Sequence, residues 1–404
     1  MANRIDALVK AIEARVKASS TTTNQVRRRL SAEVSLLELD VEEDATLSDA
    51  DKLRIQALLV GLQSELELRF AERKGILQVV LDLLDEIVRI AAVWLFLVDS
   101  AFLLAIPAVI LDIVYPSQKL TIYAKQFVGQ MCLLLSAVTL TVTGLEGEPE
   151  KKFGSSVNLL CFSHASTMDA FILSAAVPVR HYSLAKSALF AIPFFSWHLA
   201  AYGGVAIDRS DKEQAVRALA AAAASAHSGD CVAVAPEGTR STTGHLVSFK
   251  KGPFYLWESL KCPIIPAVIY GAFELYPPGT QMSLPGRVVM QFLQPILPSE
   301  ASTREEMSRI VRRRMLTAIQ NAPDGVGDTA KVGIWDRGLS YAAIAAIFTL
   351  NAFVLAFLLD TLRRENVSLL SFALASTACV GGVTAALYGY KTHVSPRMLK
   401  AKSL

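Results

Sequence analysis

Apolar and charged residues alternate at helical spacing through the N-terminal part of the chain. The first recurring apolar positions are Ile5, Leu8, Val9, Ile12 and Val16. Their spacing predicts an amphipathic helix, and similar patterns predict helices at 53–70 and 76–90. We therefore expect residues 1–89 to form a charged amphipathic helical region, suited to packing or self-association more than to a specific ligand.

A long apolar stretch follows this region. Residues 90–114 are sufficient to cross a hydrocarbon core, although Asp99 and Pro107 interrupt the run. A shorter apolar stretch occupies residues 128–142. Residues 90–143 are thus expected to be a membrane-associated helical pair, which either spans the bilayer twice or lies as a hairpin in one leaflet.

Short apolar runs alternate with helical segments from residue 144 to residue 325, a pattern typical of an α/β domain. The predicted strands are 157–162, 232–235, 263–269 and 287–293. Ser210 with Glu213, and Ser302 with Glu305, have the spacing of capping boxes and predict the starts of two helices.

Two further apolar stretches, 339–359 and 369–388, predict a transmembrane hairpin within residues 326–404. Basic residues flank the hairpin on both sides and favour a cytosolic α/β domain and tail, whereas Arg363 and Arg364 in the turn oppose that orientation. The final residues KAKSL have the spacing of a dilysine signal for the endoplasmic reticulum, or are simply a basic tail.

Composition narrows the function classes. A net charge of +3, with basic and acidic residues interleaved, argues against nucleic-acid binding. The five cysteines lie far apart without a CxxC pair, so neither a metal site nor a disulfide framework is expected. The charged N-terminus has no apolar core of the kind that a cleaved signal peptide needs.

The segment CFSHASTMDAFIL contains an HxxxxD pattern formed by His164 and Asp169. Imidazole is a base that titrates near neutral pH, and it can take the proton from an acceptor hydroxyl. A carboxylate on the first turn of the next helix can hold the imidazole tautomer. We therefore predict His164 and Asp169 as a catalytic dyad.

Two other segments carry residues suited to binding an anion. Lys186 precedes an apolar helix, and Arg209 ends a presumed strand that starts after Gly203. Residues 237–240, the EGTR of VAVAPEGTRS, directly follow a buried strand, so that glycine N–H groups and the Arg240 guanidinium can approach a phosphate.

These segments together resemble the glycerolipid acyltransferase family that includes the 1-acylglycerol-3-phosphate (lysophosphatidic acid) acyltransferases. Four blocks occur in the family's order, namely HASTMD at 164–169, GGVAIDR at 203–209, PEGTRS at 236–241 and PIIP at 263–266. The resemblance covers roughly residues 150–300 and implies a mixed sheet flanked by helices. Ala188, Ala206 and Ala235 depart from frequent family residues at lining positions.

The resemblance implies roles for individual residues. It makes His164 and Asp169 the dyad, Arg209, Glu237, Gly238 and Arg240 the phosphate-binding group, and Pro266 a part of the acyl pocket. We expect Lys186, Gly203 and Thr239 to complete the substrate-binding set, with no metal and no cofactor beyond acyl-CoA as co-substrate.

The expected reaction moves an acyl group from acyl-CoA to the sn-2 hydroxyl of lysophosphatidic acid, with the lipid bilayer and the lysophospholipid as partners. PEGTRS resembles the lysophosphatidic acid branch more than the lysophosphatidylcholine branch. The alternatives are another lysophospholipid or glycerol-3-phosphate as acceptor, and a non-catalytic membrane scaffold. A serine hydrolase is disfavoured because the chain has no GxSxG elbow.

Overall fold

The computed structural model describes residues 24–364 apart from several gaps. The gaps are 44–47, 49–51, 54, 61–75, 108, 111–118, 146–152, 155, 209–211, 228, 281–282, 324–325 and 328–333. The predicted helix around Ile5–Val16, the second hairpin stretch at 369–388 and the Ser210 cap lie outside the described residues.

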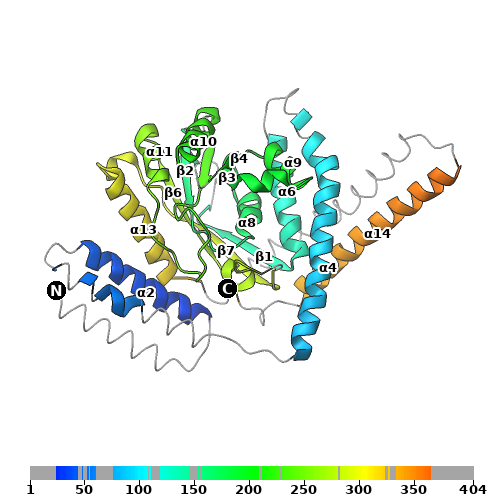
Figure 1. The fold of residues 1–404 in the computed structure, drawn as a ribbon, viewed down its shortest axis with the longest axis horizontal. Helices are drawn as coiled ribbons and strands as arrows, with labels where there is room; N and C mark the ends of the chain where they lie inside the picture. The colour runs from blue at the N-terminus through cyan, green and yellow to red at the C-terminus, as the bar shows by residue number, and fades with distance from the viewer. Residues whose placement is uncertain are drawn as a thin grey trace, which may run out of the picture.

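A seven-stranded sheet forms the centre of the described chain (Figure 1). Its order is β1 (Val138–Thr143), β7 (Gly286–Phe292), β6 (Ile264–Tyr270), β2 (Asn158–Phe162), β5 (Cys231–Val234), β3 (His181–Lys186) and β4 (Gly204–Ile207). Strands β6, β2, β5, β3 and β4 run parallel, whereas β7 is antiparallel to β6 and parallel to β1. The sheet is therefore mixed, as predicted.

The central strands are largely apolar on both faces, since helices cover both faces of the sheet. In β2, Leu159 and Cys161 point into one buried cluster, and Leu160 and Phe162 point into the other. This alternation follows from the two-residue period of a strand. It explains why these segments appear in the sequence as short continuous apolar runs rather than as polar–apolar alternation.

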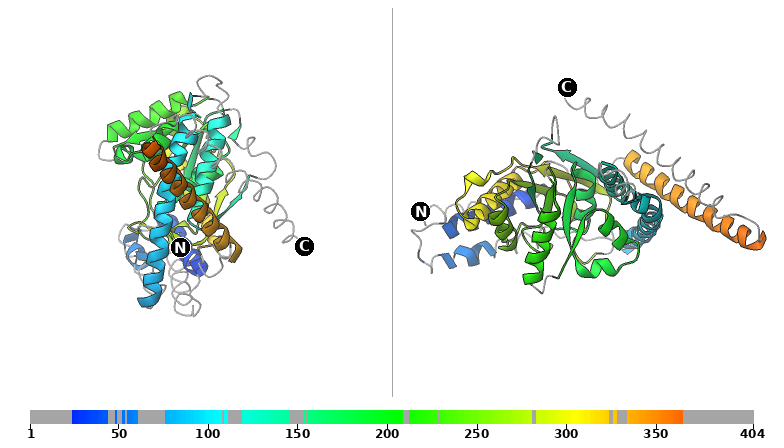
Figure 2. Two further views of the ribbon diagram at one scale, coloured as in Figure 1. Left: turned by 90° about the vertical axis from the view of Figure 1, so that its right-hand side faces the viewer. Right: turned by 90° about the horizontal axis from the view of Figure 1, so that it is seen from above.

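Three helices cover the first face, namely α10 (Lys212–Ser225), α11 (Gly252–Leu260) and α13 (Arg304–Gln320). The second face is covered by α6 (Lys119–Leu135), α8 (Asp169–Ala176) and α12 (Ala272–Leu275). The short elements η2 (Ser187–Ala191) and α9 (Phe195–Ala201) lie between β3 and β4 in the chain, and η3 (Pro298–Glu300) precedes α13. The sheet is thus enclosed between two helical layers (Figures 1 and 2).

All four predicted strands are confirmed, as β2, β5, β6 and β7. Residues 128–135 of the apolar stretch predicted at 128–142 are helical, as part of α6, but the prediction was wrong for its end. There β1 begins at Val138, and the β-branched alternation VTLTVT enters the sheet. The α/β region accordingly begins before residue 144. It also extends beyond residue 325, since Val326 is buried in the core.

The capping-box prediction at Ser302 was displaced by one residue. The N-cap of α13 is Thr303, whose hydroxyl accepts a hydrogen bond from the backbone N–H of Glu306. The Glu306 carboxylate accepts one from the backbone N–H of Ser302. The side chains of Thr303 and Glu306 therefore stabilise the helix start, one position later than the predicted pair, Ser302 and Glu305.

Helix α2 (Asn24–Glu43) lies within the helical region expected at 1–89, although no separate helix was predicted at these residues, and it packs along α13. Both helices lie on the same side of the sheet (Figure 1). Leu30, Val34 and Val41 of α2 are buried. The N-terminal region therefore includes a helix that contacts the α/β domain.

Two of the described helices are long and apolar enough to cross a membrane, over Leu83–Ala105 and Arg337–Val354. The first span lies in α4 (Ile76–Ser100) and the π-helical turn η1 (Ala101–Ala105), and the second lies in α14 (Ile334–Arg364). Since α4 is continuous through residue 90, the predicted boundary at 89 falls inside a helix.

Polar side chains join α4 to α14 within these apolar helices. The buried Arg89 donates hydrogen bonds to the hydroxyl of Ser340 at 2.9 Å and to the backbone carbonyl of Leu135 at 3.2 Å. Asp99 accepts one from the side-chain amide of Asn351 at 3.1 Å. Asp99, which interrupts the apolar run in the sequence, therefore has a partner on the neighbouring helix, as polar groups in apolar surroundings require.

Leu160→Ala should lower the free energy of unfolding by about 2–5 kcal/mol, because Leu160 is fully buried at the centre of β2 and its truncation leaves a cavity. Chemical denaturation of the detergent-solubilised protein measures this loss. Leu297→Ala is the matched control, because Leu297 is 52% exposed and its truncation should cost less than about 0.5 kcal/mol. Equal losses in the two variants would contradict the proposed core.

Candidate functional site

The loop between β2 and α8 carries the predicted dyad. His164 follows the carboxyl end of β2, and Asp169 is the first residue of α8. Asp169 is only 1% exposed, whereas the side chain of His164 retains 18% exposure. The loop thus presents the imidazole near the surface while the carboxylate remains inside.

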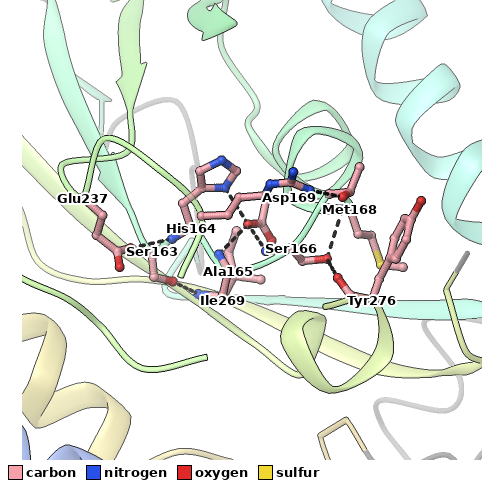
Figure 3. Close-up of polar contacts among 11 residues, drawn as sticks. Ser163, His164, Ala165, Ser166, Met168, Asp169, Glu237, Ile269 and Tyr276 are labelled. Atoms are coloured by element: carbon pink, nitrogen blue, oxygen red, sulfur yellow. Dashed lines mark hydrogen bonds and ion pairs between the residues drawn. The ribbon is translucent and has the colours of Figure 1, made fainter. Parts of the chain in front are cut away.

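The two side chains are in direct contact (Figure 3). His164 Nδ1 lies 2.8 Å from Asp169 Oδ2. The same oxygen accepts hydrogen bonds from the backbone N–H groups of Ala165 and Ser166, each at 2.9 Å. These bonds fix the carboxylate in place, and because Asp169 engages Nδ1, Nε2 is the ring nitrogen left to face a substrate.

Two serines hold the same loop in its conformation (Figure 3). The Ser163 hydroxyl accepts a hydrogen bond from the backbone N–H of Ile269 in β6 at 2.9 Å, which ties the start of the loop to the neighbouring strand. Ser166 donates to the backbone carbonyl of Tyr276 at 2.8 Å and accepts from the N–H of Met168 at 3.1 Å. Ser166 was not among the predicted site residues, although a serine three residues before a helix start is a recognisable turn signal.

Glu237 connects the dyad loop to the loop after β5. It is 1% exposed, and its carboxylate accepts hydrogen bonds from the backbone N–H of His164 at 2.8 Å and of Val247 at 3.1 Å. Burial raises the pKa of Glu237 to about 8, against the opposing effect of these two bonds. Glu237 therefore contacts the protein backbone through both carboxyl oxygens, and its place among the phosphate-binding residues stays a prediction.

The rest of the PEGTRS segment forms the turn beside the dyad loop. Gly238 has a φ of +73°, a value that favours glycine, and Thr239 is exposed. The Arg240 guanidinium donates a hydrogen bond to the hydroxyl of Thr167 in the dyad loop. The structure therefore brings the Arg240 cation of one predicted motif into contact with the loop that carries the predicted dyad of another.

The remaining predicted residues lie farther along the sheet. Lys186 is exposed at the carboxyl end of β3, which β5 separates from β2. Gly203 lies before β4, at the opposite end from the dyad, and a φ of +78° accounts for glycine there. Pro266 is buried within β6 opposite Cys161, not at the loop that carries the dyad. Arg209 lies outside the described residues.

A cavity of about 40 Å³ lies beside the dyad loop. Its lining includes His164 and Glu237, together with Ser31, Ala32 and Ser35 of α2 and His245 of the loop after β5. No local pattern in the sequence predicts that Ser31 of α2 meets His245, because these two residues are more than 200 positions apart in the chain. Tertiary packing alone places the N-terminal helix at the site.

Comparison with known proteins supports an acyltransferase domain. The Acyltransferase family model matches residues 140–270. A 1-acyl-sn-glycerol-3-phosphate acyltransferase of Saccharomyces cerevisiae is 29% identical over 231 residues, which is 55% of this chain and 73% of that protein. One from Pseudomonas aeruginosa is 30% identical over 156 residues, covering 38% of this chain and 58% of that protein.

A solved structure shares the fold. The crystal structure of the 1-acyl-sn-glycerophosphate acyltransferase from Thermotoga maritima superposes with a TM-score of 0.52, at 22% identity, covering 60% of this chain and 96% of that chain. The resemblance predicted from the four motif blocks is therefore confirmed, and so is an α/β mixed sheet flanked by helices.

The stability of the wild-type protein should fall, relative to Glu237→Gln, as the pH rises from about 4.5 to about 8. Within this interval folded Glu237 retains a proton that the unfolded chain has released, so rising pH favours unfolding by about 1 kcal/mol or more. Thermal unfolding of both proteins across the interval measures the difference. Glu237→Gln should also lower the free energy of unfolding by an amount that does not depend on pH. The reason is that the side-chain N–H₂ of the glutamine is a donor and would face a backbone N–H, which is also a donor. A difference independent of pH would contradict the raised pKa.

Proposed function

We propose that this chain, whose residues 140–270 match the Acyltransferase family, is an acyl-CoA-dependent 1-acylglycerol-3-phosphate O-acyltransferase. The observation that carries the proposal is the contact of 2.8 Å between His164 Nδ1 and Asp169 Oδ2. A buried, doubly hydrogen-bonded carboxylate behind a partly exposed imidazole is the arrangement that a general base requires.

In the proposed reaction, His164 Nε2 takes the proton of the sn-2 hydroxyl as that oxygen attacks the thioester carbonyl carbon. The C–S bond then breaks, coenzyme A leaves as a thiolate, and the imidazolium returns its proton to the sulfur. Asp169 stabilises the transient imidazolium through Nδ1–H. Because a thiolate is a good leaving group, neither a covalent acyl-enzyme nor a metal ion is needed.

Arg240 is the proposed ligand of the acceptor phosphate, supported by its contact with Thr167 in the dyad loop. A planar guanidinium can bind two phosphate oxygens and thereby orient the acceptor. With the phosphate bound, the sn-2 hydroxyl is held near His164 Nε2, so the reaction does not depend on a chance orientation of the acceptor. Lys186, Thr239, the Gly238 backbone and Arg209 remain further proposed contributors, with Pro266 proposed near the acyl chain.

We place the enzyme in a membrane as a multi-pass protein of the endoplasmic reticulum, with the α/β domain on the cytosolic side. The apolar lengths of α4 and α14 support membrane insertion, and the basic flanks and the KAKSL tail support the orientation and address. A membrane position is chemically reasonable because the acceptor, the donor chain and the product are all lipids.

The acceptor is tested by incubating the purified protein and radiolabelled acyl-CoA with a panel of acceptors, and identifying each product. The panel contains lysophosphatidic acid, glycerol-3-phosphate and lysophosphatidylcholine. Phosphatidic acid as the main product supports the proposal, and another main product reassigns the acceptor. No product with any acceptor would favour the non-catalytic scaffold.

His164→Ala and Asp169→Asn should each lower kcat by about 100-fold or more, because each removes part of the general base. The assay is radiolabelled phosphatidic acid formation at saturating substrates. Thermal unfolding of each variant serves as the folding control. Activity close to that of the wild type in either folded variant would refute the dyad.

Arg240→Gln should raise KM for lysophosphatidic acid about tenfold to 100-fold, the loss expected for one or two charge-assisted hydrogen bonds, and leave KM for acyl-CoA unchanged. Steady-state kinetics with each substrate varied in turn measures both constants. Arg304→Gln is the matched control, because Arg304 is a surface residue paired with Glu258 and Glu305. An equal rise in both KM values would contradict a phosphate-specific role.

A further inference from the structure

Helix α2 lies outside residues 140–270, the part of the chain that matches the Acyltransferase family, yet it reaches the candidate site. It packs along α13 on one side of the sheet (Figures 1 and 2). Ser31, Ala32 and Ser35 line the cavity that His164 and Glu237 also line. An N-terminal helix is therefore part of the structure around the proposed dyad.

Polar contacts join α2 to the domain at different places. In the first half of the helix, Ser31 Oγ is hydrogen-bonded to His245 Nδ1 at 2.5 Å, and Ser31 is only 3% exposed. Near its end, Asp40 forms an ion pair of 2.9 Å with Arg313 of α13, in which both side chains remain about half exposed. The buried contact therefore lies at the site, and the exposed contact lies away from it.

His245 belongs to the loop that holds the backbone of His164. Two residues later, the Val247 N–H donates to Glu237 Oε2 at 3.1 Å, and Glu237 Oε1 accepts from the N–H of His164 at 2.8 Å. The Ser241 N–H in the same loop donates to the carbonyl of His164 at 2.8 Å. A short series of contacts therefore leads from α2 to both backbone polar groups of the proposed base.

The loop has little room to shift next to His245. Gly244 has a φ of +80°, and a Cβ at this position would lie 2.5 Å from the ring of Phe273. The chain is thus confined by Phe273 at Gly244 and bonded to α2 at His245. Because the backbone cannot shift easily here, the hydrogen bond between Ser31 and His245 fixes the position of the loop in addition to stabilising the fold.

We infer that α2 is a positioning element of the acyltransferase site, in which Ser31 acts through His245 to hold Glu237 against the backbone of His164. The inference rests on the proposed function for its kinetic consequence. Ser31 is a positioning residue, because it contacts the loop and not the reacting atoms. The N-terminal helix is accordingly a working part of the catalytic unit.

Ser31→Ala in the full chain should lower kcat for phosphatidic acid formation about tenfold, since small displacements of a catalytic group are costly, and leave KM for acyl-CoA unchanged. Ser31→Thr, which keeps the hydroxyl, should restore most of kcat. Asp40→Asn, which weakens α2 docking at its other end, should match the wild type. An unchanged kcat in Ser31→Ala, or a threonine variant as slow as the alanine variant, would overturn the inference.

A double-mutant cycle tests whether Ser31 acts through His245. In the His245→Ala background, Ser31→Ala should cause little further loss of kcat, because the partner is already absent. Additive losses would show that Ser31 acts by another route and would overturn the inference. Thermal unfolding of all four proteins confirms that each is folded at the assay temperature.

Hydrogen exchange provides a readout that does not depend on activity. Peptides that contain the amides of His164 and Val247 should exchange faster in Ser31→Ala than in the wild type or Asp40→Asn, because their acceptor Glu237 is less firmly held. Unchanged exchange would refute the positioning role. If the wild type transfers no acyl group while this exchange pattern is observed, the proposed function fails and the structural role of α2 stands.

Discussion

The candidate site depends on the hydrogen bonds accepted by the buried carboxyl group of Glu237. This group accepts backbone N–H bonds from two loops that are distant in sequence, one carrying His164 and the other carrying Val247. Burial disfavours the charge of this carboxylate, whereas the two bonds favour it. Without this bridge, the loop with the proposed base and the loop with the proposed phosphate ligand would lack their common acceptor.

The sheet makes this bridge geometrically available. Strands β2, β5 and β6 are neighbours and run parallel, so their carboxyl ends meet at one edge. There His164 bonds to Glu237, and its neighbour Ser163 bonds to Ile269, although more than 100 residues separate Ser163 from Ile269. Parallel α/β sheets commonly bind ligands at such an edge, because the loops that leave the strands converge there.

Segments outside the matched region extend the α/β domain on two sides. On one side, α4 and α14 are joined by hydrogen bonds of Arg89 with Ser340 and of Asp99 with Asn351, which pair polar side chains within apolar helices. On the other side, α2 contacts α13 and the loop with His245. The domain is thus held between an apolar helix pair and a helix that reaches the proposed site.

The sequence by itself determined the α/β class, four strands, the motif order and the pairing of His164 with Asp169, because each depends on local periodicity or on residues five positions apart. It misassigned residues 138–142, whose apolar character suits a membrane helix and a buried strand alike, and did not predict α2. Only the tertiary structure decided that Glu237 holds the backbone and that Ser31 meets His245. Such contacts join residues far apart in the chain, and no local pattern encodes which of them meet in the folded protein.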